Sequence, residues 1–190
     1  MATLFRKFVD RLDRAVGVEI VETLFYEMNA ADFLTGVSWP EGMRVERIAP
    51  VSTGMLARAS GGIDSGMIES RLRSGEACYA AYVNGELAHY SWIKSSGVQP
   101  ILEAAAECVI HPGEFWIYHC WTEKWARGMR IYPSVLATIV RDYFEERFTT
   151  AKIYTTLENG PSQKGILRAG FREASRMRAL RVGRFYFKIG

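Results

Sequence analysis

The sequence predicts an α+β fold in which an antiparallel meander leads into a β-α-β crossover. Two strand-like runs, 77–83 and 86–93, are joined by Asn84-Gly85. A strand-like run at 115–122 is followed by a helical pattern and then by a second strand-like run at 152–157. A final pair of strand-like runs closes the chain. Strands that are first adjacent and then separated by helices are typical of a sheet flanked by helices.

The composition fits one compact domain preceded by an extension. A chain of 190 residues with 48% hydrophobic content can bury a substantial core. Its 24 Lys+Arg and 21 Asp+Glu leave a formal charge of +3, far from the basic balance of a dedicated nucleic-acid binder. We therefore expect no nucleic-acid partner, an N-terminal helical extension at 1–42 and a domain at 43–190.

The sequence also favours a soluble, cytoplasmic protein without a membrane partner. No apolar run approaches the ~20 residues that a membrane span needs, and the first residues lack the apolar core of a signal peptide. The three cysteines, Cys78, Cys108 and Cys120, form no CxxC pair and are odd in number. We expect reduced thiols, no disulfide framework and no metal site.

The expected extension begins with one amphipathic helix. Apolar residues recur at helical spacing between residues 3 and 16, and acidic residues are mixed with basic ones on the other face. That mixture favours packing on the domain or on a partner over binding to a membrane. Residues 18–27 suit a strand or a short second helix, and 39–42 read as a turn.

The domain itself opens with a short strand at 45–48. Gly61-Gly62 then breaks the chain, and Asp64 suits the N-cap of a helix that runs to about Arg73. The runs that follow are rich in Tyr, Ala, Val and Trp. Their Asn84-Gly85 connection tolerates the positive φ angles of a type I′ turn, which predicts an antiparallel hairpin.

The crossover begins where the strand 115–122 ends in a polar turn at 123–128. Pro133 fits the first turn of the helix that follows. Its apolar stripe is formed by Val135, Leu136, Ile139, Val140, Tyr143 and Phe144.

After the strand 152–157, Asn159 caps a short helix that stops at Gly170. The last hairpin follows, with strands at 173–182 and 184–189.

Two helix N-termini in this crossover are candidate ligand sites. A helix N-terminus presents unpaired N–H groups and a positive dipole end to an anion. At the first, Arg127 and Arg130 add cations and Gly128 lets the backbone approach a phosphate. At the second, Asn159 and Ser162 follow the next strand, so both termini can lie at one end of the sheet. An ordinary exposed turn and a plain helix cap are the alternatives.

These residues resemble motifs of the GNAT N-acetyltransferases, over about residues 44–190. The segment 122–132, TEKWARGMRIY, looks like the family's pyrophosphate loop, a strand end followed by Q/R-x-x-G-x-G/A. Asn159-x-x-Ser162, leading to Ala169-Gly170-Phe171, looks like its downstream N-x-x-A/S…K-x-G-F signature.

Three positions depart from the family pattern. Trp125 and Arg130 stand where the loop has Gln or Arg and a small residue. Ile166 stands where many members carry a tyrosine that protonates the departing thiolate.

The resemblance implies a three-layer fold with a central mixed, mostly antiparallel sheet of about seven strands flanked by helices. It also implies acetyl-coenzyme A as the cofactor. Backbone amides from Arg127 to Ile131 would hold the pyrophosphate, and strand 115–122 would pair with the pantetheine arm. The residues implied to bind the cofactor are Trp121, Thr122, Arg127, Gly128, Met129, Arg130, Ile131, Asn159 and Ser162.

The implied reaction is direct attack of a primary amine of a small molecule, amino sugar or peptide on the thioester. A general base would help to deprotonate the incoming ammonium. The candidates are His119 and Tyr118 on the strand and Glu158 before the Asn159 cap, with Glu123 at the loop mouth. We interpret His89 and His111 as ordinary surface or edge residues.

Other functions are compatible with the same motifs. A non-catalytic coenzyme A-binding or interaction module would explain the departures at Trp125, Arg130 and Ile166. Transfer of a longer acyl or aminoacyl group is a third option, and a homodimer is compatible with the sequence. The arginines between 172 and 184 indicate either an acidic or phosphorylated acceptor or a solvated hairpin face.

Overall fold

The structure is a computed structural model that describes residues 17–33, 39–48, 56, 59, 61 and 64–189. The amphipathic helix expected at 3–16 lies outside these residues. Within the described ranges, no helix is both long enough and apolar enough to cross a membrane.

The described elements follow one another in a fixed order. The first half contains β1 (Val18–Asn29), η1 (Ala30–Asp32), β2 (Met43–Arg47), α2 (Ser65–Arg73), β3 (Ala77–Val83), β4 (Glu86–Lys94), β5 (Val98–Ile101), η3 (Leu102–Ala104) and β6 (Ala106–Val109). The second half contains β7 (Glu114–Thr122), η4 (Lys124–Ala126), α3 (Ile131–Glu145), β8 (Thr150–Thr156), α4 (Gly160–Arg168), β9 (Arg172–Val182) and β10 (Phe185–Lys188).

One large sheet organises the chain. In the described ranges it has eight strands in the order β10-β9-β1-β8-β7-β4-β3-β2. β7 and β8 are parallel, and the other neighbouring pairs are antiparallel. The expected α+β class and mostly antiparallel sheet are confirmed, with one strand more than the seven or so expected.

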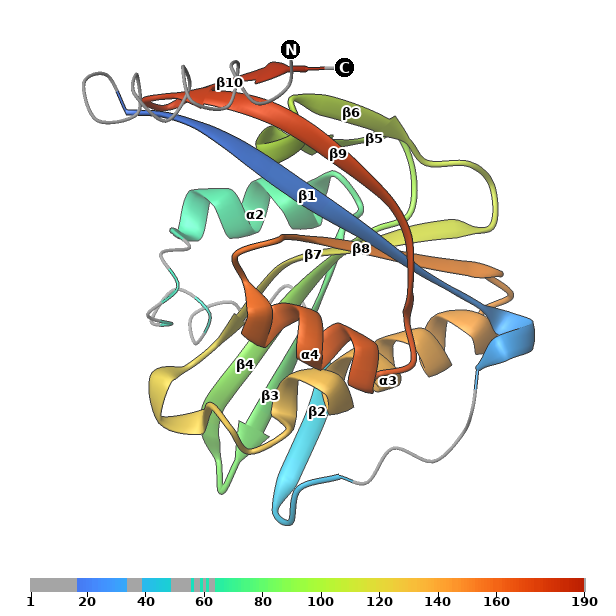
Figure 1. Cartoon of the computed structure of the whole chain (residues 1–190). Helices are drawn as coiled ribbons and strands as arrows, with labels where there is room; N and C mark the ends of the chain where they lie inside the picture. Colours follow the sequence, from blue (N-terminus) through green and yellow to red (C-terminus); the bar gives the residue numbers. More distant parts are fainter. Residues whose placement is uncertain are drawn as a thin grey trace.

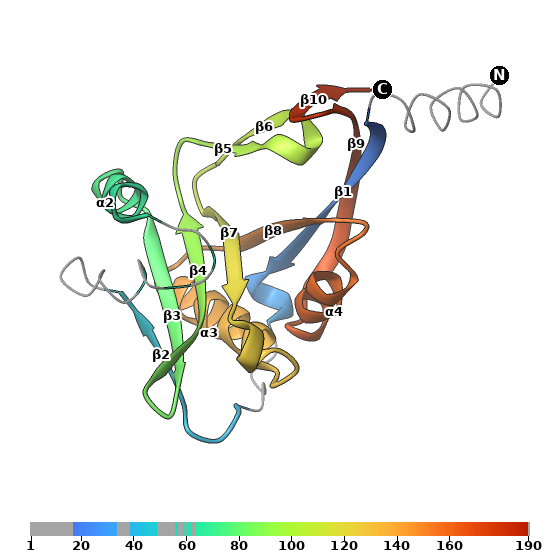
Figure 2. The ribbon, with the colours of Figure 1, turned by 90° about the vertical axis from the view of Figure 1, so that its left-hand side faces the viewer.

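Helices and a small hairpin cover the two faces of this sheet (Figures 1 and 2). Tyr79 and Ala81 of β3 face a core that includes apolar residues of α3 and α4. The alternate residues Cys78 and Ala80 face a second core around Ile68 of α2. Because successive strand side chains point to opposite faces, α2 lies on the far side of the sheet from α3 and α4. The β5–β6 hairpin contributes to a third cluster.

Several local predictions are confirmed by backbone geometry. Asn84 and Gly85 have φ values of 52° and 87°, as the type I′ connection requires. The Asp64 carboxylate accepts a hydrogen bond from the Met67 N–H at 2.8 Å, which caps α2. Asn159 caps α4 in the same way. These caps fix where two of the helices begin.

Two regions differ from expectation. Part of the expected extension, residues 18–29, is strand β1, and it lies between β8 and β9 rather than outside the sheet. The strand alternative for 18–27 is therefore the observed one, and the expected boundary at residue 42 does not coincide with an edge of the sheet. The hairpin β5–β6 and the helix η3 between its strands had no counterpart in the sequence analysis.

Candidate functional site

The sheet has a gap where its two parallel strands diverge. β7 and β8 pair only from Glu114 to Ile117 and from Thr150 to Ile153. Beyond those residues β7 stays paired with β4, and β8 stays paired with β1. The facing backbone edges therefore have no strand partner in the described structure.

A bulge in β7 lies beside this gap. The pairing of β4 with β7 shifts register between Tyr90 and Trp92, so two residues of β7, His119 and Cys120, stand opposite Ser91. His119 has a positive φ of 44°. A β-bulge bends its strand and leaves a backbone group unpaired, so the bulge helps to separate β7 from β8.

A cavity of about 610 Å³ occupies the gap. Its helix side is lined by Tyr132 of α3, by Ser162 of α4 and by Asn159, the α4 N-cap. Its hairpin side is lined by Arg71 of α2 and by Gln99, Pro100, Leu102 and Glu103. The strands contribute Tyr118, His119, Cys120, Ile153, Tyr154, Thr155 and Thr156. The cavity is therefore lined by residues from both faces of the sheet.

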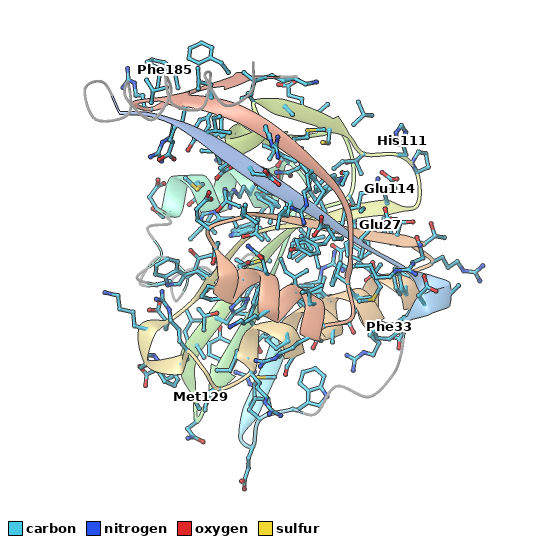
Figure 3. The ribbon with its side chains drawn as sticks, viewed as in Figure 1. Glu27, Phe33, His111, Glu114, Met129 and Phe185 are labelled. Atoms are coloured by element: carbon cyan, nitrogen blue, oxygen red, sulfur yellow. The ribbon has the colours of Figure 1, made fainter. Side chains whose placement is uncertain are left out.

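The loop before α3 lies on the helix side of the sheet. Figure 3 shows Met129 in this loop and Glu114 at the opposite end of β7. Gly128 has a φ of 84°, and no atom lies within 4 Å of a Cβ built there. Arg130, the α3 N-cap, has a φ of 59° and gives the helix no side-chain cap. The N-cap residue thus offers the first turn of α3 no side-chain acceptor, which fits binding of a pyrophosphate at this helix N-terminus.

The residues predicted to bind the cofactor differ in where their side chains lie. The Arg127 Nε donates to the Thr122 carbonyl at 3.2 Å, and its guanidinium lies 5.2 Å from the centre of the Trp121 ring. Arg127 thus folds onto its own loop, while Arg130 is exposed. The lining of the cavity includes Asn159 and Ser162 but none of the predicted residues from Trp121 to Ile131.

Tyr132, which the sequence analysis did not single out, connects this loop to the cavity. Its hydroxyl lies 3.4 Å from the Ser162 Oγ, so it bridges α3 and α4. Its ring fills the space above Gly165, where a built Cβ would come within 2.4 Å of Tyr132 Cδ1. Burial raises the pKa of Tyr132. Ile166 is fully buried in the core and lies outside the cavity lining.

His119 lines the cavity, but its ring is already engaged. The Arg71 Nη1 lies 2.8 Å from the His119 Nδ1. Because a guanidinium can only donate, Nδ1 is the acceptor and the neutral ring carries its proton on Nε2. Burial, and then the neighbouring Arg71 charge, lower the pKa of His119 to about 4. Near neutral pH His119 is therefore uncharged and has no free lone pair for an incoming proton.

The other two candidate bases are also placed unfavourably for that role. Tyr118 lines the cavity, and its hydroxyl donates to the Glu76 carboxylate. Burial, and then that hydrogen bond, raise the pKa of Tyr118. Glu76 is also paired with Lys94 at 3.4 Å. Glu158 is exposed and is not part of the cavity lining.

The hairpin side supplies polar groups that sequence reasoning missed. Gln99 is 2% exposed, and its Oε1 has no hydrogen-bond partner among the described residues. Glu103 is the only carboxylate in the described cavity lining. Neither residue belongs to a motif, and their hairpin was not predicted, so no sequence signal identified them.

The position expected for His89 was wrong. We expected a surface or edge residue, but His89 is 1% exposed. Its two ring nitrogens lie 2.8 Å from the Thr122 Oγ1 and 2.7 Å from the Ser91 Oγ. Burial lowers the pKa of His89 to about 3. A neutral, hydrogen-bonded histidine therefore supports β7 from within the sheet.

The arginines of the last hairpin have acidic partners on the protein itself. Arg176 and Arg178 pair with Glu22 of β1 at 3.1 and 3.0 Å. Arg172 pairs with Asp32, and Arg181 with Glu19. These contacts fit the solvated-face interpretation.

Comparison with known proteins identifies the fold. No family model and no curated protein matches the sequence. Among solved structures, a GNAT-family acetyltransferase from Colwellia psychrerythraea matches with a TM-score of 0.61 and 16% identity, over 90% of this chain and 57% of that one. A GCN5-related N-acetyltransferase from Kribbella flavida gives 0.61 and 15%, over 90% and 62%. A tandem GNAT protein from the clavulanic acid biosynthesis pathway gives 0.55 and 13%, over 91% and 57%.

These comparisons confirm the expected GNAT fold. At such low identity they establish the fold alone. This chain spans about three fifths of the length of the three structures.

Proposed function

On this GNAT fold, we propose that the chain is an N-acetyltransferase that moves an acetyl group from acetyl-coenzyme A to a primary amine by direct attack. The observation that carries the proposal is the cavity between the diverging strands β7 and β8. It is lined by Tyr132 and Ser162 on one face of the sheet and by Arg71 and Glu103 on the other. Two reactants can therefore approach each other from opposite faces.

The helix side fits coenzyme A. The uncapped N-terminus of α3 and the open space at Gly128 suit its pyrophosphate. The free backbone edge of β7 starts at Tyr118, so we place the pairing with the pantetheine amides there rather than at 115–117, which pair with β8. Asn159 and Ser162 border the same route. When bound, the cofactor supplies a thioester whose carbonyl carbon accepts the amine nitrogen as the C–S bond breaks.

Glu103 is our choice for the general base. The attacking nitrogen must lose a proton, and a carboxylate in the cavity can accept it. Glu103 meets that condition, whereas His119 has its Nδ1 occupied by Arg71 and Glu158 is outside the lining. In this arrangement His119 and Tyr118 position Arg71 and Glu76 instead of transferring the proton.

A specific contact favours the alternative of a non-catalytic coenzyme A-binding or interaction module. Tyr132 bridges to Ser162 across the space between α3 and α4, and Ile166 places no acid in the cavity. If the Tyr132 ring stays in place, it leaves less room for the pantetheine arm to reach the gap between β7 and β8.

Cofactor binding and turnover separate the two functions. We would measure thermal stabilisation by acetyl-coenzyme A and then thiol release with a panel of small amines, amino sugars and peptides. The enzyme should be stabilised and should release thiol, because a ligand that binds only the native state raises its stability. Stabilisation without turnover supports the module. Absence of stabilisation at saturating cofactor contradicts both functions. A preference for longer donors would indicate another acyl group.

A further inference from the structure

The hairpin side of the cavity contains one positive and one negative side chain. Arg71 comes from α2, and Glu103 comes from η3 between the hairpin strands. Within the described part of the chain, Arg71 forms no ion pair with a carboxylate, and Glu103 forms none with a cation. The two charges therefore lie too far apart for a direct salt bridge, although both line one cavity.

Arg71 is held in a fixed orientation that leaves hydrogen-bonding capacity. Its guanidinium lies 5.0 Å from the centres of both the Trp92 and the Tyr118 rings, and its Nη1 donates to His119. A guanidinium has five N–H donors in a planar fork that matches a carboxylate. Stacking against two rings lowers the entropy lost when such a ligand binds.

Both charges act on the same tyrosine in the cavity wall. Burial raises the pKa of Tyr154, and the Glu103 and Cys120 charges raise it further, whereas a hydrogen bond with the Gln99 side chain and the Arg71 charge lower it. Arg71 and Glu103 are therefore both within electrostatic reach of the Tyr154 hydroxyl. Tyr154 lines the same cavity, so a small molecule bound beside it lies in the field of both charges.

Gln99 adds an acceptor that lacks a donor. Its side-chain N–H group donates to the Pro100 carbonyl at 3.0 Å, but its buried Oε1 is unpartnered in the described structure. A buried acceptor without a donor is destabilising, and a ligand N–H group would satisfy it. Gln99 lines the same cavity as Glu103.

We propose that the acceptor is a small zwitterionic amine, of which an α-amino acid is the simplest example. Its carboxylate pairs with the Arg71 guanidinium, and its ammonium lies beside Glu103 and the Gln99 Oε1. A simple alkylamine would leave Arg71 without an anion. This inference rests on the proposed function, which identifies the hairpin side as the acceptor side. Its claim concerns binding of the amino acid, however, and can be tested without turnover.

The test is a binding comparison between acids and their amides. Each common L-amino acid and its carboxamide is offered to the full chain, with and without coenzyme A, and binding is followed by saturation-transfer NMR and titration. We expect at least one amino acid to bind roughly 10- to 100-fold more tightly than its carboxamide. Arg71→Gln should reduce that ratio to within about 3-fold, because the carboxamide loses little when the guanidinium is removed.

Two further variants separate recognition from folding. Arg71→Lys keeps the charge but not the planar fork, so it should retain part of the preference for the acid. Arg73→Gln changes an exposed arginine two residues further along α2 and should keep the wild-type ratio. Melting temperatures of all variants show whether each one is folded.

These experiments distinguish failure of the zwitterion inference from failure of the acetyltransferase proposal. If amino acids bind through Arg71 but no thiol is released, the binding inference stands and the acetyltransferase proposal fails. If no amino acid binds under either condition, or if acids and amides bind equally well to the wild type, the zwitterion inference is overturned. A preference for the acid that survives Arg71→Gln also overturns the role of Arg71.

Discussion

The two sides of the cavity differ in what they offer a ligand. Beside Tyr132, Asn159 and Ser162, which line the cavity there, the helix side offers backbone groups at the N-terminus of α3 and along the free edge of β7. The hairpin side presents side chains, namely Arg71, Gln99 and Glu103. Backbone groups suit a ligand whose chemistry is constant, because any residue that preserves the φ and ψ angles preserves the contact. Side chains suit a ligand that differs from one protein to another. In the proposed function, this difference favours cofactor binding on the helix side and acceptor selection on the hairpin side.

Gly128→Asp should have the largest effect and should act on the helix side alone. The variant places a carboxylate beside the expected pyrophosphate and strains a residue with a φ of 84°. We expect the affinity for acetyl-coenzyme A to fall roughly 100-fold or more, measured by calorimetric titration. Gly85→Asp introduces the same side chain at a φ of 87°, also in open space but in the β3–β4 hairpin turn. Equal affinity of the Gly128 variant and the wild type would refute the loop assignment.

Glu103→Gln should act on the hairpin side alone. Loss of a general base costs on the order of 100-fold in kcat/KM, while the affinity for acetyl-coenzyme A should not change. Glu107→Gln, on the exposed surface of the same hairpin, is the matched control. A Glu103 variant with wild-type kcat/KM would remove Glu103 from the mechanism. Weaker binding of acetyl-coenzyme A to the Glu103 variant would contradict the separation of cofactor and acceptor binding between the two sides.

Gly165→Ala tests how closely the helix side is packed. The new methyl group would lie 2.4 Å from the Tyr132 Cδ1, so the ring must move. We expect a loss of roughly 1–3 kcal/mol in the free energy of unfolding, measured with denaturant. In a Tyr132→Ala background the same substitution should be close to neutral, because its neighbour is gone. Equal costs in both backgrounds would show that Tyr132 does not occupy this space.

Asn159→Ala should have the smallest effect. The Asn159 Oδ1 accepts from the Ser162 N–H at 3.2 Å, and loss of such a cap costs about 1 kcal/mol. Asp64→Ala removes the equivalent cap of α2, on the other face, and should cost a similar amount. Only the Asn159 variant should also weaken cofactor binding. If the two variants affect cofactor affinity equally, Asn159 is a structural cap and nothing more.

Two features of the fold were predictable because their signals are local. The cap at Asn159 and the turn at Asn84-Gly85 depend on a few adjacent residues, and the structure confirms both. The position of β1 was not predictable, since it depends on pairing with β8 and β9, more than a hundred residues away.

The hairpin side lacked comparable signals. β5 contains Pro100, which argues against a strand, and the chain turns through Ala105 at a φ of 47°, where a glycine or asparagine would have marked the turn. The charges at Arg71 and Glu103 are 32 positions apart in the sequence. Only the fold brings them to one cavity.

The most direct test of the division between the two sides is a crystal structure with coenzyme A bound. We expect the pyrophosphate at the N-terminus of α3 beside Gly128, the pantetheine arm along β7 from Tyr118 onward, and the thiol in the gap between β7 and β8. Tyr132 should have moved from its contact with Ser162 or should pack against the arm. Coenzyme A bound elsewhere, or with its thiol outside the gap, would contradict the assignment of the helix side to the cofactor.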